Sequence, residues 1–369
     1  MAARFWCAAA GAAQPKLYSM LRPLVAVIVL VLAGLATNVA APAWACGCGA
    51  YIPDQPGPAV VDERALIAWN GTTEDILMSF GVRGSSDKAA WIMPVPSAAA
   101  VTLGDGAAFD ELARLTAPRI EYRDSWWPSF KWLAMGAGPV TDAAAPGGGV
   151  SVLDQQRIGP FDVTRLAADD PAALAGWLAG HGFPHPPGLD QNLAPYLADR
   201  WEIVAVQLAA DTPDDALTGT LQPLRLTFAS ERAVYPMRLS RSASTPQSVD
   251  LYVLAEHRMD PSAVPVAGNT PTLRFAGALA PAQVSPALAP FVGDGAFLTR
   301  WSNQIDDPVA ITGDYAFAPA AADTEYRQVI YRERDRGNVT GAALLIAIPT
   351  VFIAATIGIT LWRVRRQAR

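Results

Sequence analysis

Two cysteines set one residue apart are the residues with the clearest capacity for chemistry. Cys46 and Cys48 lie in the stretch ACGCGAYIP, and thiols this close could form a disulfide, a redox pair or part of a metal site. A ring closed across one residue is strained, which raises the reduction potential of its disulfide, although the intervening glycine relieves part of the strain. No histidine or third cysteine stands nearby to complete a zinc site. We therefore interpret the pair as a candidate disulfide, with a labile redox pair as the alternative.

The three histidines are the only imidazole ligands in the chain. His181 and His185 lie in GHGFPHPP, and an i, i+4 spacing would suit a metal pair on a helix, but Gly182 and the prolines prevent a helix there. A loop site that adds His257 and Asp190 would need four well-placed ligands. We interpret His181 as a helix C-terminal cap and His185 as a turn residue. The sequence predicts no metal site and no cofactor.

Strings typical of hydrolytic enzymes are not matched with their partners. Ser85–Lys88 reads SSDK, which fits the S-x-x-K string of penicillin-binding enzymes, but neither S-D-N nor K-T-G follows it. We interpret Gly84–Lys88 as a turn between two strands. The acidic pairs Asp214–Asp215 and Asp306–Asp307 could be carboxylate dyads or cation ligands, and we interpret them as solvated loop acids. No catalytic residue is predicted.

An aromatic cluster follows the first third of the chain. The stretch SWWPSFKW contains four large aromatic residues: Trp126, Trp127, Phe130 and Trp132. If they are exposed, they could stack on sugar rings or contact a protein, because aromatic faces bury a large area at low entropic cost. If they are buried, they belong to the core. The four residues are our candidate binding surface.

The first of two apolar segments that set the compartment has the features of a secretory signal peptide. Arg22 precedes the uncharged run Leu24–Ala36, and an A-x-A site predicts cleavage after Ala45. The run is short for a membrane span, which needs about 20 residues. We predict that residues 1–45 are the signal peptide, with Met20 as an alternative start. A lipoprotein signal or an uncleaved N-terminal anchor would place the cysteines at the membrane instead.

The second apolar segment has the length of a membrane-spanning helix. Gly341–Trp362 is uncharged and long enough for about 30 Å of hydrocarbon, and Pro349 within it is tolerated in membrane helices. The tail, residues 363–369, carries four arginines and no acid, which predicts that it lies in the cytoplasm. We therefore expect a single-pass protein of the cell membrane with an extracytoplasmic body.

The charge of the body excludes partners that need a basic surface. Seven of the 28 basic residues lie in the two terminal segments, whereas all 34 acidic residues lie between them, so the body has a net charge of −13. Nucleic acids and anionic lipids are bound through clustered positive charge, so we expect no nucleic-acid partner. A body of almost 300 residues is long enough for one large domain or two ordinary ones.

Strand patterns open the body. Glu63–Asn70 and Thr73–Val82 flank an Asn-Gly pair, the strongest short signal of a hairpin. Four apolar residues of the second strand alternate and should share one face: Ile76, Met78, Phe80 and Val82. With Ala89–Pro96 as a third strand, the pattern predicts a three-stranded antiparallel meander.

Later segments alternate between short helices and strands. The expected helices are Phe109–Leu115, Pro171–His181 capped by Asp170, and Leu193–Asp199. The expected strands are Val150–Ile158, Trp201–Leu208, Leu221–Phe228, Val249–His257 and Thr272–Leu279. A Gly/Ala-rich stretch at 141–150 would divide the body into a β-rich part, 46–140, and an α+β part, 150–330. The fold class is therefore β-rich α+β, with antiparallel, sandwich-like sheets, a few short helices and a C-terminal transmembrane helix.

The sequence resembles a bacterial secreted family in three stretches. These are RIGPFDVTRLAADDPAALAGWLAGHGFPHPP, ACGCGAYIP and TEDILMSFGVRGSSDKAAWIMPVPS, which are similar to the family known as domain of unknown function 2330. The resemblance extends from Cys46 to about Phe317. It implies the order of signal peptide, body and membrane helix, and it implies no activity.

Two classes of function follow from these observations. The sequence favours a non-enzymatic module of the cell envelope that binds a protein or a glycan and is tethered to the membrane. The alternative is an envelope enzyme, either thiol-redox through Cys46 and Cys48 or a hydrolase that uses carboxylates.

Overall fold

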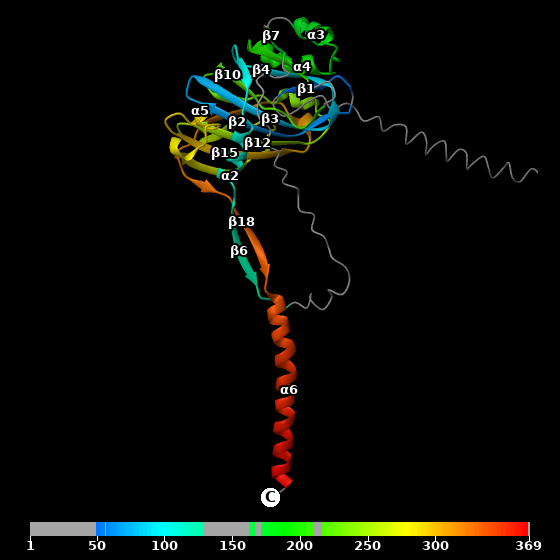
Figure 1. The fold of residues 1–369 in the computed structure, drawn as a ribbon, viewed down its shortest axis with the longest axis vertical. Coiled ribbons are helices and arrows are strands. Elements are labelled where there is room, and N and C mark those ends of the chain that lie inside the picture. Colours follow the sequence, from blue (N-terminus) through cyan, green and yellow to red (C-terminus); the bar gives the residue numbers. More distant parts are fainter. Residues whose placement is uncertain (1–48, 56, 129–161, 167–170, 210–215, 368–369) are drawn as a thin grey trace, which may run out of the picture.

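An elongated arrangement of a strand-rich body, a two-stranded ribbon and a long helix is seen in the computed structural model (Figure 1). The structure describes residues 49–55, 57–128, 162–166, 171–209 and 216–367. The predicted fold class is confirmed, because antiparallel sheets dominate the body and the helices within it are few and short.

The largest sheet has nine strands in the order β17-β14-β15-β12-β2-β3-β10-β5, with β9 paired to β3. Every pairing in it is antiparallel except that of β12 with β2. The strands are β2 (Ala59–Trp69), β3 (Thr73–Ser86), β5 (Ala100–Leu103), β9 (Leu217–Thr220), β10 (Leu224–Ala229), β12 (Gln247–Ala255), β14 (Thr272–Leu279), β15 (Ala296–Ile305) and β17 (Tyr326–Arg327).

Two smaller antiparallel sheets complete the body. One has the order β1-β4-β8-β7, and the other has the order β11-β16-β13. Their strands are β1 (Ala50–Pro53), β4 (Lys88–Val95), β7 (Asp162–Leu166), β8 (Glu202–Ala209), β11 (Ala233–Tyr235), β13 (Met259–Ala263) and β16 (Tyr315–Pro319). Strands from both predicted parts of the body, 46–140 and 150–330, share the nine-stranded and the four-stranded sheets.

Side chains alternate between the two faces of each strand and form three apolar cores. One core lies between the sheets, and one lies on the outer face of each of the two larger sheets. On β3 four residues point into the central core, as predicted from their spacing: Ile76, Met78, Phe80 and Val82. Leu77, between two of them, faces the opposite side. On β4, Trp91 and Met93 face the central core, while Ala90 and Ile92 face outward. Because both sheets are buried on two faces, their strands read as nearly continuous apolar runs.

Short helices cover the two outer faces. The helices α3 (Pro171–Gly180) and α4 (Leu189–Ala198) pack on the outer face of the four-stranded sheet, on the side of the body away from the ribbon (Figure 1). The helices α2 (Ala107–Leu115) and α5 (Ala289–Val292) pack on the outer face of the nine-stranded sheet. The three helices expected from the sequence are therefore present, and Gly182 has the left-handed φ of +73° expected after α3. The short helix α5 was not expected.

The Asn-Gly hairpin is confirmed, but the three-stranded meander is wrong. The carboxamide oxygen of Asn70 accepts hydrogen bonds from the N–H groups of Thr72 and Thr73, at 3.1 and 2.9 Å, and β2 pairs with β3. The next strand, β4, pairs with β1 and β8 instead of β3. The chain crosses to the second sheet at Asp87, because β4 is apolar on both faces and is buried by a core on each side.

The other predicted strands lie close to their expected bounds where the structure describes them. The strand predicted for Thr272–Leu279 matches β14, and the three strands before it correspond to β8, β10 and β12. The predicted strand Val150–Ile158, the loop at 141–150 and the cap Asp170 lie outside the described residues.

Candidate functional site

The long C-terminal helix is the feature with the plainest physical role. Helix α6 (Gly337–Gln367) is exposed along its apolar length and contains an 18-residue window with a mean hydropathy of 2.4. Its threonine hydroxyls at positions 350, 356 and 360 donate to backbone carbonyls one turn earlier. Polar groups in the hydrocarbon core of a membrane must form their hydrogen bonds within the protein, because no water is present there. By length and composition, α6 could cross a membrane.

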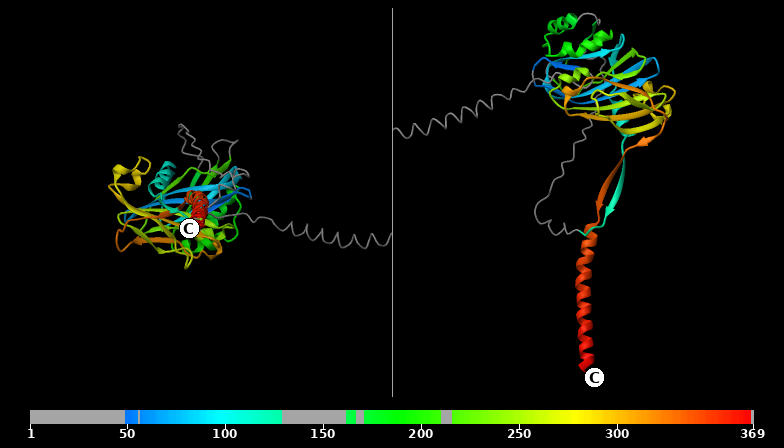
Figure 2. Two further views of the ribbon diagram at one scale, coloured as in Figure 1. Left: turned by 90° about the horizontal axis from the view of Figure 1, so that it is seen from below. Right: turned by 180° about the vertical axis from the view of Figure 1, so that it is seen from behind.

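A two-stranded ribbon, which we call the stalk, connects α6 to the body (Figure 1). It consists of β6 (Arg119–Ser125) and β18 (Val329–Asp335), which pair in parallel over seven residues each. At about 3.3 Å per residue the stalk is roughly 23 Å long. Seen from behind, the body, the stalk and α6 follow one another along a single axis (Figure 2).

Side chains on the stalk are paired across its two strands. The guanidinium of Arg123 lies 3.7 Å from the ring centre of Tyr331, and that of Arg334 lies 4.6 Å from the ring centre of Tyr122. Arg336 Nε lies 3.6 Å from a carboxylate oxygen of Asp124. A two-stranded ribbon is marginal in water by itself, so these cation–π and ion pairs help to hold the strands together.

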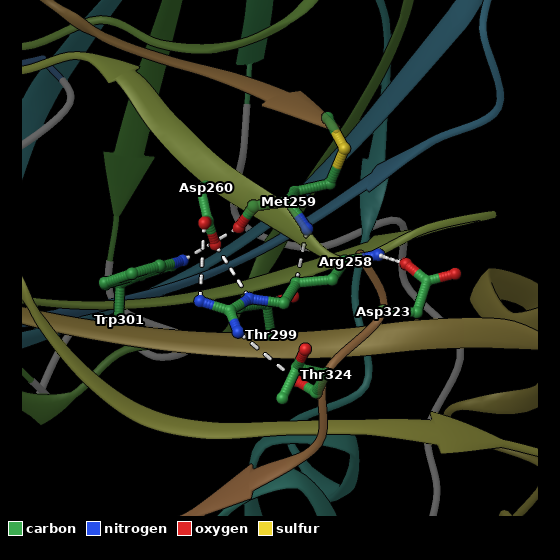
Figure 3. Close-up of polar contacts among 7 residues, drawn as sticks. All are labelled: Arg258, Met259, Asp260, Thr299, Trp301, Asp323 and Thr324. Carbon is green, nitrogen blue, oxygen red and sulfur yellow. Dashed lines mark hydrogen bonds and ion pairs between the residues drawn. The ribbon is translucent and has the colours of Figure 1, made fainter. Parts of the chain in front are cut away.

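A cluster around Arg258, which we call the base clamp, fixes the segment that enters the stalk (Figure 3). The Arg258 side chain makes a forked contact with Asp260, with Nε–Oδ1 at 2.9 Å, and its Nη1 donates to the carbonyl of Thr324 at 3.3 Å. The Arg258 N–H donates to the carboxylate of Asp323 at 2.7 Å. The clamp therefore holds residues 323–324 just before β17.

The strand β13, which begins beside Arg258, is itself tied to the large sheet. The N–H of Met259 donates to the hydroxyl of Thr299 at 3.2 Å, and the indole of Trp301 donates to the carbonyl of Met259 at 3.0 Å (Figure 3). Just before the two stalk strands begin, the Arg327 guanidinium donates to the carbonyl of Ala117 at 2.7 Å. Both strands of the stalk therefore start from fixed points on the body.

The predicted aromatic surface is partly described. Trp126 and Trp127 directly follow β6 and are 55 % and 84 % exposed, so these two do not belong to the core. Phe130 and Trp132 lie outside the described residues, as do Cys46 and Cys48 of the candidate disulfide. Exposed large apolar side chains elsewhere in the stalk and its base are Ile120, Tyr122, Tyr326, Ile330 and Tyr331.

The histidines each have their own partner. The ring nitrogen Nδ1 of His181 lies 2.8 Å from the carbonyl of Trp177, in keeping with the predicted capping role. His185 lies 3.1 Å from Asp190, and His257 lies 2.9 Å from Asp323. The bond to Asp323 raises the pKa of the exposed His257. Within the described ranges, no three His, Cys, Asp or Glu side chains are grouped so that they could hold a metal ion.

Two buried glutamates lie under the short strand β11. The carboxylate of Glu74, which is wholly buried, accepts a hydrogen bond from the N–H of Val234 through both oxygens at 3.2 Å. Glu63, also buried, accepts from the hydroxyl of Tyr235. Burial raises the pKa of Glu74 well above 4.5, against the lowering effect of the bonds from Val234 and Ser230. Sequence reasoning missed both residues, since a carboxylate in an apolar strand does not reveal its partner.

Open cavities surround the tip of the β2–β3 hairpin. One, of about 500 Å³, is lined by Trp201, Ser230, Glu231, Arg232 and others around Gly71. A neighbouring cavity of about 650 Å³ is lined mostly by small residues, together with Phe228, at the adjacent ends of β5 and β10. Both cavities are lined by a mixture of polar and apolar residues.

A strand-rich body joined by a stalk to a long, exposed apolar helix is an arrangement compatible with membrane anchoring. The family of uncharacterized proteins conserved in bacteria, DUF2330, matches residues 42–318, and the chain belongs to this family. The match covers most of the body and ends before β17, β18 and α6.

Other comparisons add little. No curated protein matches the chain. The crystal structure of baculovirus P35 is similar at a TM-score of 0.34 and 8 % identity, over 76 % of this chain and 99 % of that one. A chain of the caspase-8/P35 complex is similar at 0.28 and 5 %, over 73 % and 96 %. Scores this low do not establish a shared fold.

Proposed function

We propose that the protein is a membrane-tethered module of the bacterial cell envelope, with an extracytoplasmic body that binds an envelope protein or a glycan. In this proposal residues 1–45 are removed as a signal peptide, α6 crosses the membrane and residues 363–369 lie in the cytoplasm. The observation that carries the proposal is the exposed apolar length of α6, joined to the body by a stalk. A stalk of roughly 23 Å would keep the hairpin tip and its cavities clear of the lipid.

The topology is tested by protease protection on cells whose outer barrier has been opened. The protease should degrade the body and leave α6 with a C-terminal tag intact until the membrane is dissolved. In a matched variant the four tail arginines are replaced by glutamate. This change should lower the fraction of molecules whose C-terminus is cytoplasmic, because positively charged flanking segments are retained in the cytoplasm. A tag digested in unbroken cells, or a body that resists the protease, would contradict the proposal.

The binding role is tested at the hairpin tip. A photo-crosslinking residue at Arg232, on the rim of the 500 Å³ cavity, should capture an envelope component from living cells. The same residue at Val309, which is 61 % exposed and lies outside the cavity, is the matched control. Equal yields from both positions, or no adduct from Arg232, would contradict a binding site at this tip.

Variants of the same protein distinguish an envelope enzyme from a binding module. A thiol-redox activity would be lost when Cys46 and Cys48 are both replaced by serine, whereas capture through Arg232 would persist. A carboxylate hydrolase would instead depend on acids near the cavities. Glu74 is a poor candidate, because it is enclosed beneath β11 and bound to Val234.

A further inference from the structure

The segment that carries Trp126 and Trp127 is held at the first turn of α6 by two hydrogen bonds to its backbone carbonyls. The N–H of Arg336 donates to the carbonyl of Ser125 at 2.8 Å, and the hydroxyl of Thr340 donates to the carbonyl of Trp126 at 2.9 Å. These bonds join the end of β6 to the start of the helix. The two tryptophans therefore sit at a fixed level along the axis of α6, although they are far from it in sequence.

Their exposure is unusual for such large side chains. Trp126 is 55 % exposed and Trp127 is 84 % exposed. A tryptophan buries about 150–250 Å² of surface when it is covered, so leaving two in water forgoes a large stabilisation. Something should cover this pair in the working protein, and its position limits what that can be.

The apolar stretch of α6 lacks an aromatic residue at the end where the pair lies. Gly341–Trp362 is about 33 Å long as a helix, and its first aromatic residue is Phe352, near the middle. The far end has Trp362, whose ring lies 4.2 Å from the guanidinium of Arg366. Membrane helices are typically bracketed by Trp or Tyr at both interfaces, where the ring is apolar and the N–H meets water.

We propose that Trp126 and Trp127 lie in the headgroup layer of the membrane that α6 crosses, and form a second point of attachment beside the helix. This inference rests on the proposed function, since it requires α6 to span the bilayer. The occupant of the tryptophan surface is lipid, because Trp126 is bonded to the first turn of α6 and the pair is therefore level with the N-terminal end of the exposed apolar helix. Two attached segments would restrain the tilt of the stalk.

The test uses the full-length protein in bilayers of brominated lipids, which quench tryptophan fluorescence on contact. The double variant Trp126→Phe with Trp127→Phe should lose most of the quenchable emission. If those two and Trp362 contribute equally, the loss is roughly two-thirds. Trp177→Phe is the matched control, because Trp177 is buried on α3, a helix on the side of the body away from the stalk, and the quenchable emission of this variant should equal that of the wild type.

A third variant tests the membrane span of α6 separately from the interfacial position of Trp126 and Trp127. Trp362→Phe should lower the quenchable emission by a smaller amount, which reports that α6 is in the bilayer. If Trp362→Phe lowers it and the double variant leaves it unchanged, the interfacial role is wrong and the membrane span stands. If brominated lipid quenches the wild type no more than ordinary lipid does, both are wrong.

Discussion

Replacing the buried Glu74 by glutamine should make the stability of the protein less dependent on pH. Both oxygens of Glu74 accept from the N–H of Val234, and the side chain is wholly buried. Burial raises its pKa well above 4.5, so the folded protein keeps a proton that the unfolded chain releases. That contribution to stability is fully present below the unfolded pKa and is lost as pH rises through the folded pKa.

The size of the effect follows from linkage. Between the unfolded and folded pKa values, the free energy of unfolding of the wild type should fall by about 1.4 kcal/mol per pH unit through this group. Glu74→Gln keeps an oxygen that accepts from Val234 and removes the titrating carboxyl. The free energy of unfolding of the variant, relative to that of the wild type, should therefore rise with pH and then level off. Glu74→Ala should lose about 2–4 kcal/mol, because it leaves the Val234 N–H buried without an acceptor and opens a void.

The assay is urea unfolding of the full-length protein in detergent, followed by near-UV circular dichroism between pH 5 and pH 9. Near-UV signals report the packing of the body and are insensitive to α6 remaining helical. Glu231→Gln is the matched control, because Glu231 is an exposed acid beside Ser230, and its curve should follow that of the wild type. A difference between Glu74→Gln and the wild type that is the same at every pH would refute the reasoning.

Three further predictions concern other contacts in the body. Gly49→Ala should lower the free energy of unfolding by about 1–3 kcal/mol, because its Cβ would lie 2.4 Å from the carbonyl of Ile92; an unchanged melting temperature would contradict this. Asp314→Ala should lower the free energy of unfolding by about 2–4 kcal/mol, because the N–H of Met237, which donates to Asp314 at 2.7 Å, and the guanidinium of Arg238 lose their partner; denaturant unfolding measures the loss. Asp323→Asn should lower the pKa of His257 toward its ordinary value, because the bond to Asp323 raises it; an NMR titration that shows no change would exclude this cause.

Local patterns were sufficient to predict the elements with a period or a turn signal. The alternation of Ile76 and Met78 predicted which residues of β3 share a face, and Asn70-Gly71 predicted the hairpin. These features are local, because a two-residue period and a positive φ at Gly71 depend only on neighbouring residues.

Pairing between distant strands could not be predicted in the same way. The parallel pairing of β12 with β2 and the transfer of β4 to the second sheet depend on which apolar surfaces meet, which one sequence does not specify. The stalk was missed for a different reason: strands such as RIEYRDS are charged on both faces and give no burial signal. The aromatic cluster was recognised, but exposure of Trp126 and Trp127 depends on the stalk.

The parallel pairing in the stalk has a consequence for the order of folding. The partner of Arg119 is Val329, about 210 residues later in the chain, and synthesis reaches it only just before α6. Until then β6 is an unpaired strand next to a partly folded body, and its free backbone groups can pair with other chains. The two strands can pair only after β18 has been synthesised, so the stalk would form late in biogenesis. A chain truncated before Val329 would have no stalk.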